Sequence, residues 1–123
     1  MCLTRISKAS GNDLAHQFLE GVRFIHENKV AHLDLKPDNI LIRMTKPLCL
    51  FIIDFSVSLW VETSEAWTAG YRGTTGWAAP EVEDNQYQPI QADLWSAGQV
   101  LKWIAQCQHA FTNSPPGEAT SRQ

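Results

Sequence analysis

Length and charge exclude several classes of function for this chain. Its 123 residues suffice for one domain, or for one piece of a domain, and they carry a formal net charge of −3. Binding to nucleic acid or to a membrane surface needs a basic face, so we expect this acidic chain to do neither. The longest apolar run, residues 48–53, is also too short to span a bilayer.

The N-terminal residues and the cysteines predict an intracellular protein. Residues 1–8 lack an apolar core of signal-peptide length. The chain has three cysteines, Cys2, Cys49 and Cys107, which lie far apart and follow no zinc-binding spacing. We therefore expect reduced thiols and a location in the cytoplasm or the nucleus.

A helix is predicted after a short, mixed lead-in of residues 1–12. Apolar side chains recur there at steps of four, four and three residues, a pattern that places them on one face of an α-helix. They are Leu14, Phe18, Val22 and Ile25. Asn28 is the predicted stop, because asparagine tolerates the left-handed conformation that ends many helices.

The next stretch, residues 32–39, gathers polar side chains around a rigid turn. Asp34, Lys36 and Asn39 are an acid, a base and an amide within a few positions of one another. Pro37 stiffens the loop between them because its ring fixes φ. Such a loop can aim all three groups at one point.

Two apolar runs are predicted to form a hairpin that ends beside this loop. Residues 40–42 follow Asn39, and residues 48–53 precede a second acid, Asp54. Pairing of the two runs brings Asn39 and Asp54 to the same end of the hairpin. Carboxylate and amide oxygens with a nearby Lys suit Mg²⁺ that bridges phosphates, since Mg²⁺ takes few protein carboxylates and leaves room for phosphate oxygens and water.

These residues resemble two motifs of the protein kinases, the catalytic loop H-R-D-L-x-x-x-N and the metal motif D-F-G. The corresponding stretches are His32-Leu33-Asp34-Leu35-Lys36-Pro37-Asp38-Asn39 and Asp54-Phe55-Ser56. The resemblance implies that Asp34 is the catalytic base for a substrate hydroxyl and that Lys36 offsets charge on the phosphoryl group transferred from ATP. It also implies that Asn39 and Asp54 bind Mg²⁺ and, with Lys36, the nucleotide. Lys36 lies two residues after Asp34, and a Lys at this place in the loop resembles the serine/threonine branch of the family rather than the tyrosine branch.

Two later stretches resemble the same family, in the same order along the chain. Gly73-Thr74-Thr75-Gly76-Trp77-Ala78-Ala79-Pro80-Glu81 looks like the end of an activation segment, and Asp93-Leu94-Trp95-Ser96-Ala97-Gly98 looks like the start of the large helix that follows. The resemblance implies that residues 56–81 form a substrate-binding and regulatory segment. It further implies that Thr74 braces Asp34. Asp93 is expected to hydrogen-bond the catalytic loop, and His32 to position its backbone.

The second helix is predicted from about Ile90 to Ala105, and apolar side chains cover most of its girth. One face carries Leu94, Ala97, Leu101 and Ile104. A helix of this kind is expected to lie in a core. Residues 113–121 are small, polar and rich in helix breakers, and we expect residues 108–123 to form a disordered tail.

Several parts of a kinase domain have no counterpart in this sequence. We find no Gly-rich loop for the phosphates, no strand Lys of the V-A-I-K type and no helix Glu to orient that Lys. Within the matching motifs, Leu33 replaces the Arg of H-R-D and Ser56 replaces the Gly of D-F-G. The expected fold is therefore α+β and mostly helical, a large-lobe fragment of a kinase-like domain over residues 13–107, with the small lobe absent.

The resemblance implies ATP-dependent phosphoryl transfer to a protein hydroxyl, in a chain too truncated to be active by itself. One alternative is a pseudokinase or binding module that holds a partner protein without catalysis. Another is a small-molecule phosphotransferase of the kinase-like superfamily, against which the A-P-E segment and Lys36 argue. Truncation also predicts self-association, because the second helix would expose apolar side chains such as Trp95, Leu101 and Trp103.

Overall fold

The computed structural model describes residues 13–112, and side chains within that range from residue 14 to residue 107. The predicted lead-in of residues 1–12 lies outside the described residues. So does the part of the predicted tail that follows residue 112.

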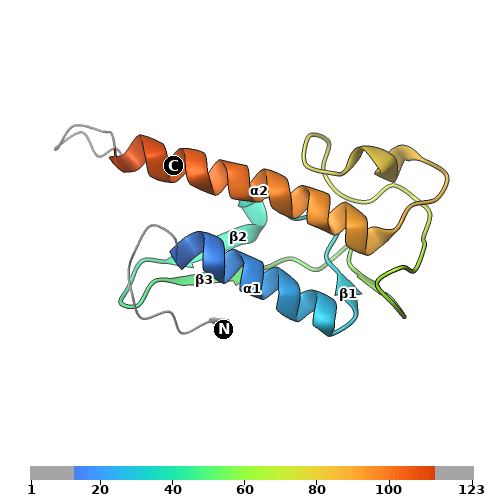
Figure 1. Ribbon diagram of the computed structural model, residues 1–123, viewed down its shortest axis with the longest axis horizontal. Coiled ribbons are helices and arrows are strands. Elements are labelled where there is room, and N and C mark those ends of the chain that lie inside the picture. Colours follow the sequence, from blue (N-terminus) through green and yellow to red (C-terminus); the bar gives the residue numbers. More distant parts are fainter. Residues whose placement is uncertain (1–12, 113–123) are drawn as a thin grey trace.

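Two helices, α1 (Asp13–Glu27) and α2 (Pro89–Thr112), run side by side in opposite directions (Figure 1). Helix α1 begins where predicted, after residue 12, and its predicted apolar face is buried at Phe18, Val22 and Ile25. The predicted stop is wrong by one residue. Asn28 still donates its backbone N–H to Phe24 O as a helical residue does, and Lys29 takes the left-handed conformation with φ of 67°.

The predicted hairpin is present as β2 (Ile40–Arg43) and β3 (Cys49–Ile52), which pair antiparallel. A second antiparallel pair, β1 (Val30–Ala31) with β4 (Leu59–Trp60), was not expected from the sequence. Short 3₁₀ turns, η1 (Pro37–Asn39) and η2 (Pro80–Glu83), complete the regular structure of the described chain. Helices with small antiparallel sheets confirm the α+β class.

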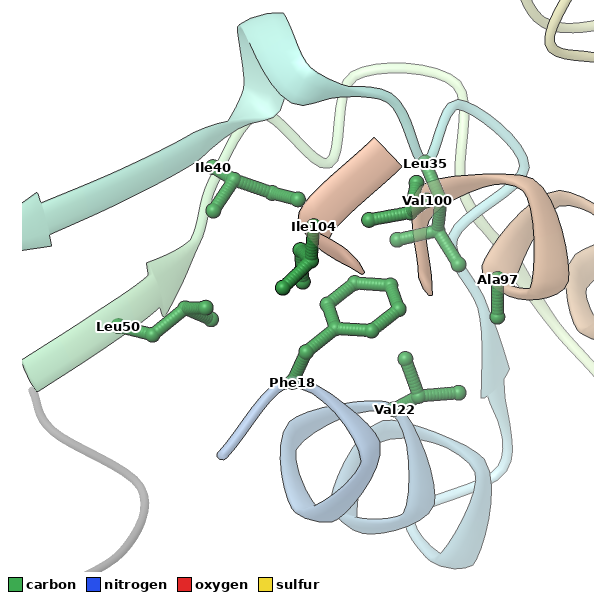
Figure 2. Close-up of a cluster of buried hydrophobic side chains, with 8 residues drawn as sticks. All are labelled: Phe18, Val22, Leu35, Ile40, Leu50, Ala97, Val100 and Ile104. Atoms are coloured by element: carbon green, nitrogen blue, oxygen red, sulfur yellow. The ribbon is translucent and has the colours of Figure 1, made fainter. Parts of the chain in front are cut away.

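The first hydrophobic cluster lies between the two helices and the inner face of the β2–β3 hairpin. Figure 2 shows the ring of Phe18 pointing into its centre from α1. The other members are Val22, Leu35, Ile40, Leu50, Ala97, Val100 and Ile104. Leu35 belongs to the polar loop predicted to be functional, so its burial in this cluster attaches the loop to the core.

The second hydrophobic cluster joins the other side of the loop to the segment around residues 57–92. Leu33 comes from the loop and Ala31 from β1, while Val61, Ala79 and Tyr87 come from later in the chain. Leu33 is only 5% exposed, so the residue that replaces the Arg of H-R-D is a core residue here. Both flanks of the loop are thus held by apolar packing.

Helix α2 differs from the prediction in its length and in its buried face. It continues to Thr112, so the boundary predicted between residues 107 and 108 falls inside the helix. Ala97, Val100 and Ile104 face the core as expected for one side, whereas Leu94 is 47% exposed. Helix α1 covers only part of the apolar girth of α2, which leaves Leu94 on the open flank. Over residues 13–112, neither helix has both the length and the apolar character needed to cross a membrane.

Candidate functional site

The predicted site residues lie on three neighbouring pieces of backbone. Asp34 and Lys36 belong to the loop between β1 and η1, Asn39 closes η1, and Asp54 follows β3. The backbone N–H of Ile53 donates to Asn39 O at 2.9 Å, which ties the start of β2 to the end of β3. The hairpin therefore brings Asn39 and Asp54 to the same end, as predicted.

Asp34 is held by hydrogen bonds to both of its carboxylate oxygens. Thr74 Oγ1 donates to Asp34 Oδ1 at 2.7 Å, and Asn39 Nδ2 lies 3.3 Å from Asp34 Oδ2. The same Asn39 nitrogen donates to the backbone O of Asp34 at 2.8 Å. The carboxylate is half-buried and fixed in one orientation, and the predicted brace from Thr74 is confirmed.

Lys36 reaches the same point from the other side of the turn. Its Nζ donates to Thr74 Oγ1 at 2.8 Å, so the Thr74 hydroxyl accepts from Lys36 while it donates to Asp34. An ammonium group and a carboxylate are thus bridged by one hydroxyl rather than paired directly. This arrangement places a positive charge next to the acid and leaves further donor hydrogens of the ammonium for another ligand.

Asn39 is 5% exposed, and its amide nitrogen is used by Asp34. Within the part of the chain that the structure describes, no hydrogen bond to its Oδ1 is found. A buried amide oxygen without a donor is costly unless a ligand or water satisfies it. Its position beside the Asp34 carboxylate, at the same end of the hairpin as Asp54, suits a cation as the ligand.

Asp54 is exposed, with a left-handed backbone of φ 63°. Hydrogen bonds from the Ser56 hydroxyl and the Ser56 backbone amide lower the pKa of Asp54, and the nearby charge of Lys36 lowers it further. The Ser56 N–H donates to Asp54 Oδ1 at 3.2 Å. Asp54 is therefore ionised at neutral pH and open to a ligand.

The residues at this corner fit Mg²⁺ by their donor chemistry. Asp34, Asn39 and Asp54 offer two carboxylates and one amide oxygen, which are hard ligands, with room left for phosphate oxygens and water. Among the described residues there is no group of three or more His, Cys, Asp or Glu side chains that could hold a metal.

Asp93, at the start of α2, fixes the loop backbone from inside. It is 1% exposed, and its Oδ2 and Oδ1 accept the backbone N–H groups of His32 and Leu33, each at 2.8 Å. This confirms the predicted brace. Sequence reasoning missed a third contact, in which His26 Nε2 on α1 lies 2.8 Å from Asp93 Oδ2.

His32 positions the loop backbone as expected, through both ring nitrogens. Its Nδ1 accepts the backbone N–H of Asp34 at 3.1 Å, and its Nε2 therefore carries the proton and donates to Ile53 O at 2.9 Å. The ring of Phe55 packs edge-on against it at 4.7 Å between centroids. His32 thus connects the loop bearing Asp34 to the strand end bearing Asp54.

Tyr87 holds the segment before Gly73 in place, a role that sequence reasoning did not find. Its side chain is 1% exposed, and its hydroxyl donates to Gly70 O at 2.7 Å. Its backbone N–H and carbonyl also pair with Thr68, at 3.0 and 2.8 Å. Burial raises the pKa of the Tyr87 hydroxyl, which therefore stays protonated and able to donate at neutral pH.

Gly73 lies close to the backbone of the loop, and its replacement by alanine tests that contact. Its φ is 114°, and a Cβ added there would lie 2.8 Å from Leu33 O. We expect Gly73→Ala to lower the free energy of unfolding by about 1–3 kcal/mol, from backbone strain and from this clash. The matched control is Gly76→Ala, where φ is 95° but nothing lies within 4 Å of the added Cβ. Equal losses in the two variants, measured by urea unfolding, would contradict the close contact.

Comparison with known proteins gives one family over nearly the whole chain. A family model for the protein kinase domain matches residues 3–122. Calcium/calmodulin-dependent protein kinase type II of Caenorhabditis briggsae is 37% identical over 98 residues, which cover 77% of this chain and 18% of that protein. Serine/threonine-protein kinase 17A of Oryctolagus cuniculus is 44% identical over 94 residues, covering 74% of this chain and 23% of that protein. The chain thus spans about a fifth of the length of these relatives.

Proposed function

The chain belongs to the protein kinase family, and we propose that it is the catalytic-loop part of the large lobe of a serine/threonine kinase domain. The proposed domain covers residues 13–107, with a lead-in before it and a tail after it. The observation that carries the proposal is the closed network in which Thr74 joins Lys36 to Asp34, beside the open amide oxygen of Asn39. The serine/threonine preference rests on Lys36 and on the name of one relative, serine/threonine-protein kinase 17A.

In the proposed reaction, Asp34 accepts the proton of a substrate hydroxyl as that oxygen attacks phosphorus. Thr74 and Asn39 keep the carboxylate in one orientation, so the acid meets the hydroxyl without first reorganising. The Lys36 ammonium lies next to Asp34 and stabilises negative charge on the transferred group. ATP would supply the phosphoryl group, with ADP as the leaving group. Asn39 and Asp54 would hold Mg²⁺, which would neutralise negative charge on the phosphates.

The isolated chain is proposed to transfer no phosphate. Its sequence contains no Gly-rich loop, strand Lys or helix Glu, the parts that hold and orient the phosphates in this family. What it does contain is the half of the site that binds the cation and receives the hydroxyl. We therefore expect nucleotide binding that depends on Mg²⁺, without turnover, in an intracellular protein whose partners are proteins.

The alternative function is a pseudokinase or binding module that holds a partner protein without catalysis. The apolar groove between α1 and α2 favours it, because the lining of that groove contains none of the predicted site residues. Both functions share one fold, so they are distinguished by whether Mg²⁺ and ATP stabilise the folded chain.

Thermal unfolding of the purified chain, with and without Mg²⁺ and ATP, tests the nucleotide half of the proposal. A ligand that binds only the folded state stabilises it by RT ln(1 + [L]/Kd), about 2.7 kcal/mol at a hundredfold excess over Kd. We expect stabilisation that needs Mg²⁺, that is lost in Asp54→Asn and that persists in the control Glu65→Gln, an exposed acid outside the site.

Two outcomes would overturn parts of this proposal. An unfolding transition indifferent to nucleotide in the wild-type chain would remove the nucleotide site and favour the binding module. Transfer of labelled γ-phosphate from ATP to a mixture of serine- and threonine-containing peptides, lost in Asp34→Asn, would show instead that the isolated chain is active.

A further inference from the structure

The turn after Asp54 gives its carboxylate two hydrogen-bond donors from a single residue, Ser56. The Ser56 N–H donates to Asp54 Oδ1 at 3.2 Å, and the Ser56 hydroxyl also hydrogen-bonds this carboxylate. In the D-F-G motif, glycine stands at the position of Ser56, and glycine supplies the N–H but no hydroxyl. The hydroxyl contact is therefore a feature of this chain and not of the motif.

Neighbouring contacts fix the turn that carries Ser56. The N–H and the hydroxyl of Ser58 both donate to Phe55 O, at 3.1 and 2.8 Å, and they close a turn with Ser56 inside it. The ring of Phe55 packs edge-on against His32, with 4.7 Å between the ring centroids. Ser56 therefore lies at a defined place beside the Asp54 carboxylate.

Serine fits this place in the turn without backbone strain. Among the described residues other than glycine, positive φ angles are found at Lys29, Leu33 and Asp54, so Ser56 does not need the left-handed backbone that favours glycine. A serine also has fewer accessible backbone conformations than a glycine. The replacement thus adds a donor and removes conformational freedom next to a predicted metal ligand.

The two donors of Ser56 leave room on the Asp54 carboxylate for a cation. An ionised carboxylate has about four lone-pair positions, and the N–H and the hydroxyl occupy two of them at most. Asp54 is exposed, so the other positions are open to a ligand. A hydrogen bond to a metal-binding carboxylate orients it toward the ion, and loss of such a partner typically lowers metal affinity by roughly ten- to hundredfold.

We propose that the Ser56 hydroxyl is a positioning group for Mg²⁺, which holds Asp54 in the orientation that binds the ion and so tightens the binding of Mg–ATP. This inference rests on the proposed function, in which Asn39 and Asp54 hold the ion. Ser56 acts through Asp54 and contacts neither the ion nor the nucleotide. Without the hydroxyl, the ion must order the Asp54 side chain as it binds, which weakens binding.

Isothermal titration calorimetry of the full chain, with ATP in an excess of Mg²⁺, tests this role. We expect Ser56→Ala to raise the Kd for Mg–ATP about tenfold. Ser56→Thr keeps the hydroxyl and should retain the wild-type Kd, a rescue that a general loosening of the turn does not explain. Ser56→Gly introduces the residue of the D-F-G motif and should bind Mg–ATP as weakly as Ser56→Ala.

Ser58→Ala is the matched control, because it removes a hydroxyl of the same turn that donates to Phe55 O and not to Asp54. It should retain the wild-type Kd for Mg–ATP. If the wild type binds Mg–ATP and Ser56→Ala binds it equally well or more tightly, this inference is overturned while the proposed function stands. A wild type that shows no Mg²⁺-dependent binding of ATP overturns both.

Discussion

Replacement of Asp93 with alanine is expected to lower the free energy of unfolding by about 3–5 kcal/mol. The carboxylate is 1% exposed and accepts the backbone N–H groups of His32 and Leu33, while His26 contacts it from α1. Alanine leaves both N–H groups buried without an acceptor, and water cannot reach them without opening the loop. Urea unfolding followed by circular dichroism measures the loss.

Two further variants separate the role of Asp93 from that of an ordinary acid. Asp93→Asn keeps one acceptor oxygen and should lose less stability than Asp93→Ala. Asp84→Ala removes an exposed carboxylate just before α2 and should change the free energy of unfolding by no more than about 0.5 kcal/mol. A similar small effect for Asp93→Ala would mean that the loop finds its acceptors elsewhere.

Phe18→Ala is expected to cost about 3–5 kcal/mol, because it empties the centre of the first hydrophobic cluster. The ring is fully buried and points among side chains from α2, the hairpin and the loop (Figure 2). Since Leu35 is in the same cluster, the cavity also loosens the support under Asp34 and Lys36. The midpoint of urea unfolding should fall, with the slope little changed.

Phe24→Ala is the control for this second prediction, because it removes the same side chain from the same helix. Phe24 is 54% exposed, so its loss creates no cavity and should cost well under half as much as Phe18→Ala. Comparable losses at the two positions would contradict the placement of Phe18 in the core.

The sequence predicted the elements whose signal lies within a few neighbouring residues. The helical spacing of Phe18 and Val22 located α1, and two apolar runs flanked by polar loops located the β2–β3 hairpin. By contrast, β1 and β4 have two residues each, and Val30 pairs with Trp60. Strands this short carry no periodicity, and their partner lies far along the chain, so local patterns could not reveal them.

The buried face of α2 and part of the site also could not be predicted from local patterns, because tertiary packing decides them. Spacing alone placed Leu94 with Ala97, but the position of α1 decides which flank of α2 is covered. In the site, the motif resemblance led to Thr74 and Asp93. The contacts of Tyr87 with Gly70 and of His26 with Asp93 join residues 17 and 67 positions apart, and they were not predicted.

Leu33 gives the attachment between the loop and the later segment an unusual dependence on conditions. Because this residue joins the two through apolar contacts with side chains such as Ala79 and Tyr87, no ion pair is involved at that point. Salt screens interactions between charges, so we expect a change in ionic strength to have little effect on these apolar contacts of Leu33. Apolar contacts weaken on cooling, so we expect the Leu33 contacts to weaken at low temperature rather than at high salt. The hydrogen bonds of Thr74 with Lys36 and Asp34, which also join the loop to the segment, involve charged groups and differ in this respect.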